Sequence, residues 1–177
     1  MTKEYRHSEY RKRKHKRNRE NIIIPLLTTS IVLVILIFTL DQINFGIRTA
    51  FGASALIFTS FASSAFIIFM MPYSKAAKTN RFVKSYVIAG IIGYIGFSAS
   101  AYINFYLIAG LIIFFVSLLL FETDSEHPPA LGIAMAFLLY RVPLTGILIL
   151  FAGIAIMVLF RKLLKKIGVL ITEIKVR

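Results

Sequence analysis

The sequence contains no cysteine and no tryptophan, and among its 177 residues eight Asp and Glu stand against 21 Lys and Arg. Without cysteine, the chain has no disulfide, no thiolate metal site and no cysteine nucleophile. Apolar side chains are abundant instead and make up 58% of the chain. Soluble domains contain about 45–50% apolar residues, so this composition indicates an integral membrane protein.

Catalytic patterns are also missing from the sequence. Three of the few acids, Glu122, Asp124 and Glu126, share one turn with a single histidine, His127. No second group of metal-binding side chains accompanies them, and the chain has no glycine-rich phosphate loop and no nucleophile elbow. We therefore predict no enzymatic activity, no metal and no cofactor.

The basic residues are concentrated toward the two ends of the chain. Nine lie in Met1–Arg19, and six follow the last apolar run, from Arg161 onward. Such blocks bind nucleic acid or anionic lipid, and a position directly beside an apolar run favours lipid and the positive-inside effect. We expect basic cytoplasmic tails at residues 1–20 and 162–177, in contact with anionic headgroups, and no nucleic-acid partner.

Apolar runs of bilayer length fill most of the remaining chain, since a spanning helix needs about 20 residues. The expected membrane segments are 22–40, 49–71, 82–101, 105–121, 128–140 and 144–160. The fifth is short enough for a half-helix or a re-entrant segment. If it crosses, the basic loop around Lys75, Lys78 and Arg81 lies on the same side as both tails, as the positive-inside rule requires. The prediction is an all-α, polytopic transmembrane helix bundle in the cytoplasmic membrane, with about six segments and a cytoplasmic N-terminus.

The two halves of this expected bundle resemble each other. In each half a long apolar helix ends at an acid, Asp41 or Glu122, and a short helix rich in small residues follows. Three segments per half would invert the second half relative to the first. Inverted repeats with interrupted helices at matching positions indicate a binding site near the middle of the membrane. An inverted 3+3 repeat is therefore one arrangement that the pattern allows.

The most polar interior stretch, FETDSEHPPALGIA at residues 121–134, leads into the second short helix. Its two consecutive prolines indicate a helix start, because proline is favoured at the first helical position. The free N–H groups of that first turn, together with the helix dipole, favour a nearby anion. A plainer alternative is a proline-capped helix at the membrane surface, with the histidine solvated or paired with the neighbouring acids.

Gly52, Ala53 and Ser54 begin the corresponding short helix of the first half. In an inverted repeat they would present a second helix N-terminus from the opposite side, and two converging N-termini suit a small monovalent anion. The predicted binding residues are His127, Pro128, Pro129, Ala130, Leu131, Gly132, Gly52, Ala53 and Ser54. An unperturbed histidine titrates at about 6.5, so His127 could also carry a proton with the anion.

Arg48 and Arg141 occupy corresponding ends of the two halves. Charges within membrane segments are costly and indicate function, so both arginines are candidates for attracting the anion. Each could equally extend its guanidinium to the interface and simply position its helix.

Small residues recur every third position at Gly90, Gly93, Gly96 and Ala99, which places them on one face of a helix. Such faces let helix backbones approach closely in membranes. For a protomer of this size, the face is a candidate contact in a homo-oligomer.

Two short motifs resemble the HPP family of integral membrane proteins. They are His127-Pro128-Pro129-Ala130, followed by small residues, and the earlier helix that begins FGASA at Phe51. The loop Pro72-x-Ser74-x-x-Ala77 with Asn80 after it is also similar to the family's. The resemblance covers roughly residues 25 to 160, so residues 21–161 are expected to form an HPP-like transmembrane domain.

The resemblance implies a bundle described with four spanning helices, fewer than the six expected here. It also implies a transport function, because some plant plastid and cyanobacterial members are nitrite transporters, whereas many bacterial members have no assigned function. One departure is Lys84-Ser85, where the family pattern leads us to expect a Gly-His pair. No role for that histidine carries over.

The sequence thus predicts a transporter or channel for a small inorganic anion, with nitrite as the best single candidate. The alternative is a non-transporting scaffold or sensor that presents the basic N-terminal tail to a partner or to lipid.

Overall fold

The computed structural model describes residues 27, 29–35, 37–39, 42, 51–71 and 74–166. Arg48, residues 1–26 and residues 167–177 lie outside this part of the chain. The helices are α3 (Phe51–Ala65), a π-helix η1 (Phe66–Met70), a short 3-10 helix η2 (Lys75–Ala77), α4 (Thr79–Ala99), α5 (Phe105–Glu122), α6 (Pro129–Leu139) and α7 (Thr145–Lys166). Within the first expected segment, residues 29–35 and 37–39 are helical. The described part of the chain contains no strand, which confirms the all-α prediction.

Three helices are long and apolar enough to cross a membrane, namely α4, α5 and α7. The segment expected at 128–140 forms α6, whose 11 residues span about 16 Å at 1.5 Å per residue. That is about half the hydrocarbon thickness of a bilayer. The bundle therefore combines full-length helices with one short helix, as the sequence predicts.

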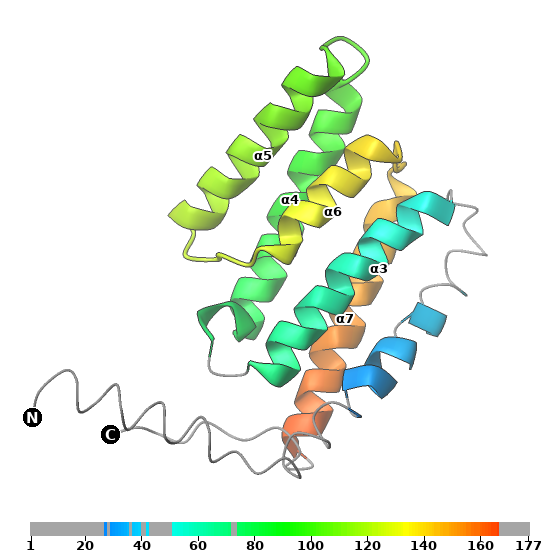
Figure 1. The fold of residues 1–177 in the computed structure, drawn as a ribbon, viewed down its shortest axis with the longest axis vertical. Coiled ribbons are helices and arrows are strands. Elements are labelled where there is room, and N and C mark those ends of the chain that lie inside the picture. Colours follow the sequence, from blue (N-terminus) through cyan, green and yellow to red (C-terminus); the bar gives the residue numbers. More distant parts are fainter. Residues whose placement is uncertain are drawn as a thin grey trace, which may run out of the picture.

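The helices α4 and α5 form an antiparallel hairpin (Figure 1). Asn104 starts α5, because its side-chain oxygen accepts a hydrogen bond from the Tyr106 N–H at 3.0 Å and so satisfies one free donor of the first turn. Farther along the hairpin, Ile112 of α5 packs directly against Gly96 of α4. This hairpin provides the wall against which α6 lies (Figure 1).

The short helix α6 also lies beside α3, and the two run in opposite directions (Figure 1). Two contacts fix this register. His127, just before α6, contacts Ser64 near the end of α3, whereas Gly132, farther into α6, meets Ser60 earlier in α3. The pair is therefore packed side by side along its length.

The helix α7 runs antiparallel to α4. Leu150 meets Gly90, and Arg161 near the end of α7 donates hydrogen bonds to the Ala77 carbonyl and, at 2.8 Å, to the Thr79 hydroxyl at the start of α4. The basic end of α7 and the basic loop before α4 thus lie at the same end of the bundle, as predicted for the C-terminal tail, whereas the N-terminal tail lies outside the described residues. The opposed directions of α3 and α6, and of α4 and α7, are those that an inverted repeat requires.

The small-residue face of α4 packs inside the protomer. Gly90 meets α7, Gly93 meets α6 and Gly96 meets α5, and all three glycines are buried. A methyl group on Gly93 would lie 2.8 Å from the Ala134 backbone, which shows how closely the helices approach. The prediction of close helix packing is confirmed. The prediction that this face joins protomers is wrong, because other helices of the same chain already cover it.

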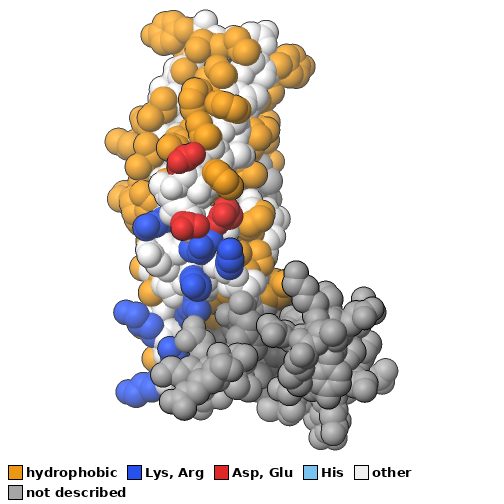
Figure 2. Space-filling view, turned by 90° about the vertical axis from the view of Figure 1, so that its left-hand side faces the viewer, with side chains coloured by type: hydrophobic (Ala, Val, Ile, Leu, Met, Phe, Trp, Pro, Cys, Tyr) orange, Lys and Arg blue, Asp and Glu red, His pale blue; other side chains and the backbone are white. Residues whose placement is uncertain are grey.

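Charged side chains of the visible face gather toward one end, with Lys and Arg below the acidic side chains (Figure 2). The exposed lysines at this end come from the loop before α4, from α4 and from the end of α7: Lys75, Lys78, Lys84, Lys162, Lys165 and Lys166. Apolar side chains cover most of the visible face above them (Figure 2). An apolar belt with a charged end is the surface that a lipid bilayer requires.

Candidate functional site

The site begins at His127, in the turn that joins α5 to α6. The turn is stabilised at its start by Asp124, whose φ of 52° reverses the chain after α5, and the Ser125 N–H donates to the Leu120 carbonyl at 2.9 Å. This pairing is a Schellman end, which satisfies the last carbonyls of a helix. The chain then folds inward, so that Ser125 and His127 are fully buried. The expectation of a solvated His127 is therefore wrong.

His127 is held by a chain of hydrogen bonds that crosses the bundle interior. Its Nδ1 lies 2.9 Å from the Ala76 carbonyl, and its Nε2 lies 2.7 Å from the Ser64 hydroxyl. Ser64 in turn lies 2.6 Å from the Tyr86 hydroxyl, which donates to the Ser60 carbonyl at 2.8 Å. The imidazole of His127 therefore connects the turn before α6 to the loop before α4 and to α3. Through Ser64 and Tyr86 the same chain of hydrogen bonds reaches α4.

Aromatic rings enclose this chain. The His127 ring lies 5.5 Å from the Phe82 ring and 5.8 Å from the Tyr86 ring, measured between centroids. Phe61 packs 5.0 Å from Tyr86 on the other side, and all of these rings are buried. Burial lowers the pKa of His127, partly opposed by the hydrogen bond to the Ala76 carbonyl. A lowered pKa favours the neutral imidazole.

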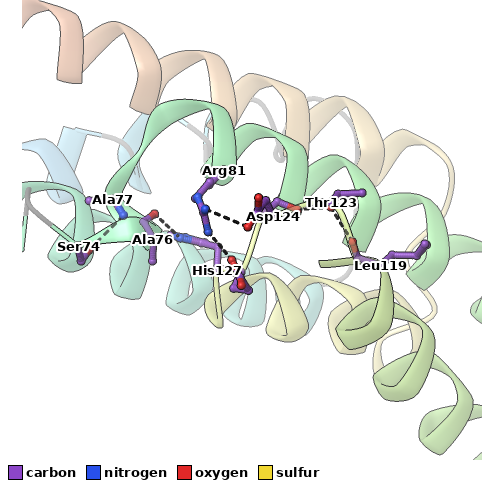
Figure 3. Close-up of polar contacts among 10 residues, drawn as sticks. Ser74, Ala76, Ala77, Arg81, Leu119, Thr123, Asp124 and His127 are labelled. Atoms are coloured by element: carbon purple, nitrogen blue, oxygen red, sulfur yellow. Dashed lines mark hydrogen bonds and ion pairs between the residues drawn. The ribbon is translucent and has the colours of Figure 1, made fainter. Parts of the chain in front are cut away.

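The acids beside His127 pair with an arginine instead of with the imidazole. Arg81, in the first turn of α4, binds Glu126 and lies 3.3 Å from Asp124, as Figure 3 shows for Arg81 and Asp124. The Arg81 side chain is 15% exposed, whereas those of Asp124 and Glu126 are 86% and 48% exposed. The expected pairing between His127 and these acids is wrong. The ion pairs instead fasten the turn before α6 to α4.

The loop before α4 is fixed from two sides. The Ser74 hydroxyl accepts a hydrogen bond from the Ala77 N–H at 3.2 Å and so starts η2. Two backbone carbonyls of η2 accept hydrogen bonds from other elements. The Ala76 carbonyl is bonded to His127 (Figure 3), and the Ala77 carbonyl is bonded to Arg161. The loop is therefore held in place by hydrogen bonds and forms one side of the site.

The first turn of α6 uses some of the N–H groups predicted to face an anion. The Ala130 N–H donates to the His127 carbonyl at 2.9 Å, and the Leu131 N–H donates to the Pro128 carbonyl at 3.1 Å. Gly132 faces Ser60, because a methyl group on Gly132 would lie 2.5 Å from the Ser60 Oγ. In the part of the chain that the structure describes, the buried Ser60 hydroxyl has no hydrogen-bond partner.

The two predicted helix starts do not converge. Because α3 and α6 are antiparallel and side by side (Figure 1), Gly52, Ala53 and Ser54 lie toward the end of α6 and not at its start. The separation along the axis is about 16 Å, the length of α6. The prediction of a site between opposed N-termini is therefore wrong. The physical reason is lateral packing, since small residues at the crossing let the helices overlap instead of meeting end to end.

The two candidate arginines are not brought to His127 either. Arg48 lies outside the described residues. Arg141 is exposed and follows the C-terminal end of α6, with a left-handed φ of 50°. The Val142 N–H donates to the Phe137 carbonyl at 3.1 Å, so Arg141 occupies the reversal position of a second Schellman end.

Neither Ser64, Tyr86 nor Arg81 was among the residues predicted for the site. The useful signal for Tyr86 was its place four residues after Phe82, which puts both rings on one helix face. For Arg81 the signal was a charge in the first turn of a spanning helix. No spacing rule connects residues so far apart in the sequence.

The described residues include no group of three His, Asp or Glu side chains placed to bind a metal ion. The spanning helices and the enclosed polar chain define a polytopic, helical membrane protein with a buried polar site. The model of the HPP transmembrane region matches residues 14–172, so the chain belongs to the HPP family. No curated protein and no solved structure matches the chain.

Proposed function

We propose that this protein is a transporter or channel for a small inorganic anion, with nitrite as the best single candidate. Family membership supports transport, because the resemblance described above includes nitrite transporters among the family's members. The observation that carries the proposal is the buried polar cluster of Ser60, Ser64, Tyr86 and His127, enclosed by α3, α4 and α6. Polar groups inside a membrane bundle are costly and indicate a functional site.

Two local features support a ligand in this cluster. The Ser60 hydroxyl is buried without a hydrogen-bond partner in the described part of the chain, and a bound anion would accept the hydrogen bond that this hydroxyl can donate. The π-helix η1 begins two residues after Ser64. Such helices occur frequently at functional sites, because they re-aim the side chains around them.

The proposed anion site therefore lies at the start of α6, among His127, Pro128, Pro129 and the first turn from Ala130 to Gly132. The hydroxyl of Ser60 completes it from α3. The dipole of α6 favours negative charge at this end. The exposed lysines of the same end raise the local concentration of anions near the protein surface.

We infer further that the basic end faces the cytoplasm, because Lys and Arg concentrate in cytoplasmic loops. The even number of expected segments then places the N-terminus on the same side. The lysines of that end would contact anionic headgroups.

Uptake of nitrite into proteoliposomes tests this proposal. Ser60→Ala removes a hydroxyl that makes no described hydrogen bond, so we expect unchanged folding and an uptake rate lowered about tenfold, the value of one hydrogen bond to a charged ligand. The matched control is Ser63→Ala, which removes an exposed hydroxyl bonded only to its own helix at Thr59. Equal uptake by both variants would remove Ser60 from the site.

A second set of assays separates transport from the scaffold alternative. Deletion of residues 1–19 leaves the polar cluster intact, so a transporter should retain uptake. Competition with nitrate, chloride and formate measures the preference among small anions. If the intact protein moves none of these anions and no nitrite, the proposed function is wrong.

A further inference from the structure

The hydrogen-bond chain through His127 contains one hydrogen fewer than it has links. It runs from the Ala76 carbonyl through His127, Ser64 and Tyr86 to the Ser60 carbonyl, which makes four links. Both ends are carbonyl oxygens, which only accept hydrogen bonds. A neutral histidine, a serine and a tyrosine supply one hydrogen each, so one of the four links is empty in every arrangement.

The choice of tautomer does not remove this shortage. With the hydrogen on Nδ1, His127 donates to the Ala76 carbonyl and Ser64 must choose between His127 and Tyr86. With the hydrogen on Nε2, the link to the Ala76 carbonyl is empty. A second hydrogen on the imidazole completes all four links, because Nε2–H then donates to Ser64, Ser64 to Tyr86 and Tyr86 to the Ser60 carbonyl.

We propose that the interior of the bundle contains a proton-binding site at His127, and that the Ser64–Tyr86 chain is the device that raises its affinity for the proton. The proton adds to the Nε2 lone pair. The proton comes from hydronium, so one N–H bond forms, one O–H bond of hydronium breaks and a water molecule is left. The Ser64 hydroxyl then rotates from Nε2 toward the Tyr86 oxygen, and no covalent bond of the other side chains changes. This inference does not depend on the identity of any transported anion.

The surroundings of the imidazole oppose and favour the charge in different ways. Burial opposes it, as does the N-terminal dipole of α6. The Phe82 and Tyr86 rings lie 5.5 Å and 5.8 Å from the imidazole between centroids, the first edge-on and the second tilted, so neither ring is stacked on it. Protonation completes the fourth hydrogen bond of the chain. This additional bond is what Ser64 and Tyr86 contribute to the proton affinity of His127.

Charged groups stand near this site on most elements packed around it. Arg81 of α4 binds both Asp124 and Glu126 of the turn, so two carboxylates surround one guanidinium and leave a net negative balance. The described side chains of α3 carry no charge. On α5 the nearest charge is Glu122, the last residue of that helix. The remaining cations at this end belong to the loop, to α4 and to α7: Lys75, Lys78, Lys84, Arg161, Lys162, Lys165 and Lys166. None of the hydrogen bonds of the imidazole goes to a carboxylate.

Nitrogen-15 NMR of the full chain in phospholipid nanodiscs tests the proposal directly. The two other histidines, His7 and His15, are replaced by glutamine, so labelled histidine reports on His127 alone. We expect the neutral form to carry its hydrogen on Nδ1 and to gain a second one as the pH falls. Tyr86→Phe leaves two hydrogens for two links, which removes the shortage. His127 should then protonate at a pH lower by about one unit, the worth of one hydrogen bond.

Ser64→Ala provides the second variant, because it removes the acceptor that the charged imidazole needs, and it should shift protonation in the same direction. The matched controls are Tyr94→Phe, elsewhere on α4, and Ser63→Ala, adjacent on α3. Both should titrate as the wild type does. The proposal is overturned if His127 remains neutral until the protein unfolds. It is also overturned if Tyr86→Phe or Ser64→Ala folds and its His127 protonates at the same pH as in the controls. If neither chain variant folds, the Nδ1–H tautomer and a protonation step in the wild type decide the question.

Discussion

Gly132 of α6 lies so close to Ser60 of α3 that a methyl group on Gly132 would stand 2.5 Å from the Ser60 Oγ and 3.7 Å from its Cβ. The first distance is a clash, whereas the second is an ordinary van der Waals contact. The hydroxyl of Ser60 is thus the atom that a methyl group at position 132 would displace. The relation between the two residues fixes how closely the two short helices pack at the polar cluster.

Gly132→Ala should destabilise the folded protein by about 1–3 kcal/mol, the usual cost of overpacking a buried contact. The double variant Ser60→Ala with Gly132→Ala should recover most of this loss, because the clashing oxygen is gone and the two methyl groups fit. Thermal unfolding in detergent measures both effects. Additive losses in the double variant would show that another contact restricts position 132.

Most of the architecture follows from local properties of the chain. Apolar runs of about 20 residues can only be helices in a membrane, and Pro128 and Pro129 mark the start of the short helix, which is observed at Pro129. The small residues of α4 predict close packing, and Gly90, Gly93 and Gly96 each meet a different helix. These features depend on sequence neighbours alone.

The site depends on pairings between distant parts of the chain and could be predicted only in part. His127 was identified, but its partners Ser64 and Tyr86 lie 63 and 41 residues earlier. The predicted convergence of helix starts failed because α3 and α6 overlap laterally, a choice made by side-chain packing at the crossing. Helix direction follows from a count of segments, whereas the depth and overlap of two helices do not.

The ion pairs of Arg81 should contribute measurably to stability. Arg81→Gln removes both contacts to the turn before α6, and a guanidinium that is 15% exposed lies between the surface and buried limits. We expect a loss of about 1–3 kcal/mol in the free energy of unfolding. Lys84→Gln, which replaces an exposed cation in the next turn of α4, is the matched control.

The two carboxylates should differ in the same assay. Asp124→Asn should change stability by less than about 1 kcal/mol, because its side chain is 86% exposed, and Glu126→Gln should have the larger effect. If Arg81→Gln and Lys84→Gln unfold at the same temperature, the ion pairs do not hold the turn.

The absence of cysteine makes the orientation directly measurable. Single cysteines at Lys78, in the loop before α4, and at Tyr102, in the turn between α4 and α5, report on opposite ends of the bundle. With the basic end in the cytoplasm, a membrane-impermeant maleimide should label Tyr102→Cys in intact cells. It should label Lys78→Cys only after lysis. The reverse pattern would place the basic end outside.

Arg141 combines a charge with a left-handed backbone, and two substitutions separate these properties. An L-residue in this conformation costs about 1–2 kcal/mol, and glycine avoids that cost at an entropic loss of about 0.5–1 kcal/mol. Arg141→Gly should therefore raise the free energy of unfolding by about 0.5–1 kcal/mol, whereas Arg141→Ala keeps the strained Cβ and should not. Both variants remove the guanidinium. If Arg141 attracts the transported anion, both lower nitrite uptake equally, whatever their stability. If Arg141 only positions the end of α6 at the interface, uptake is unchanged in both and the difference in stability alone remains.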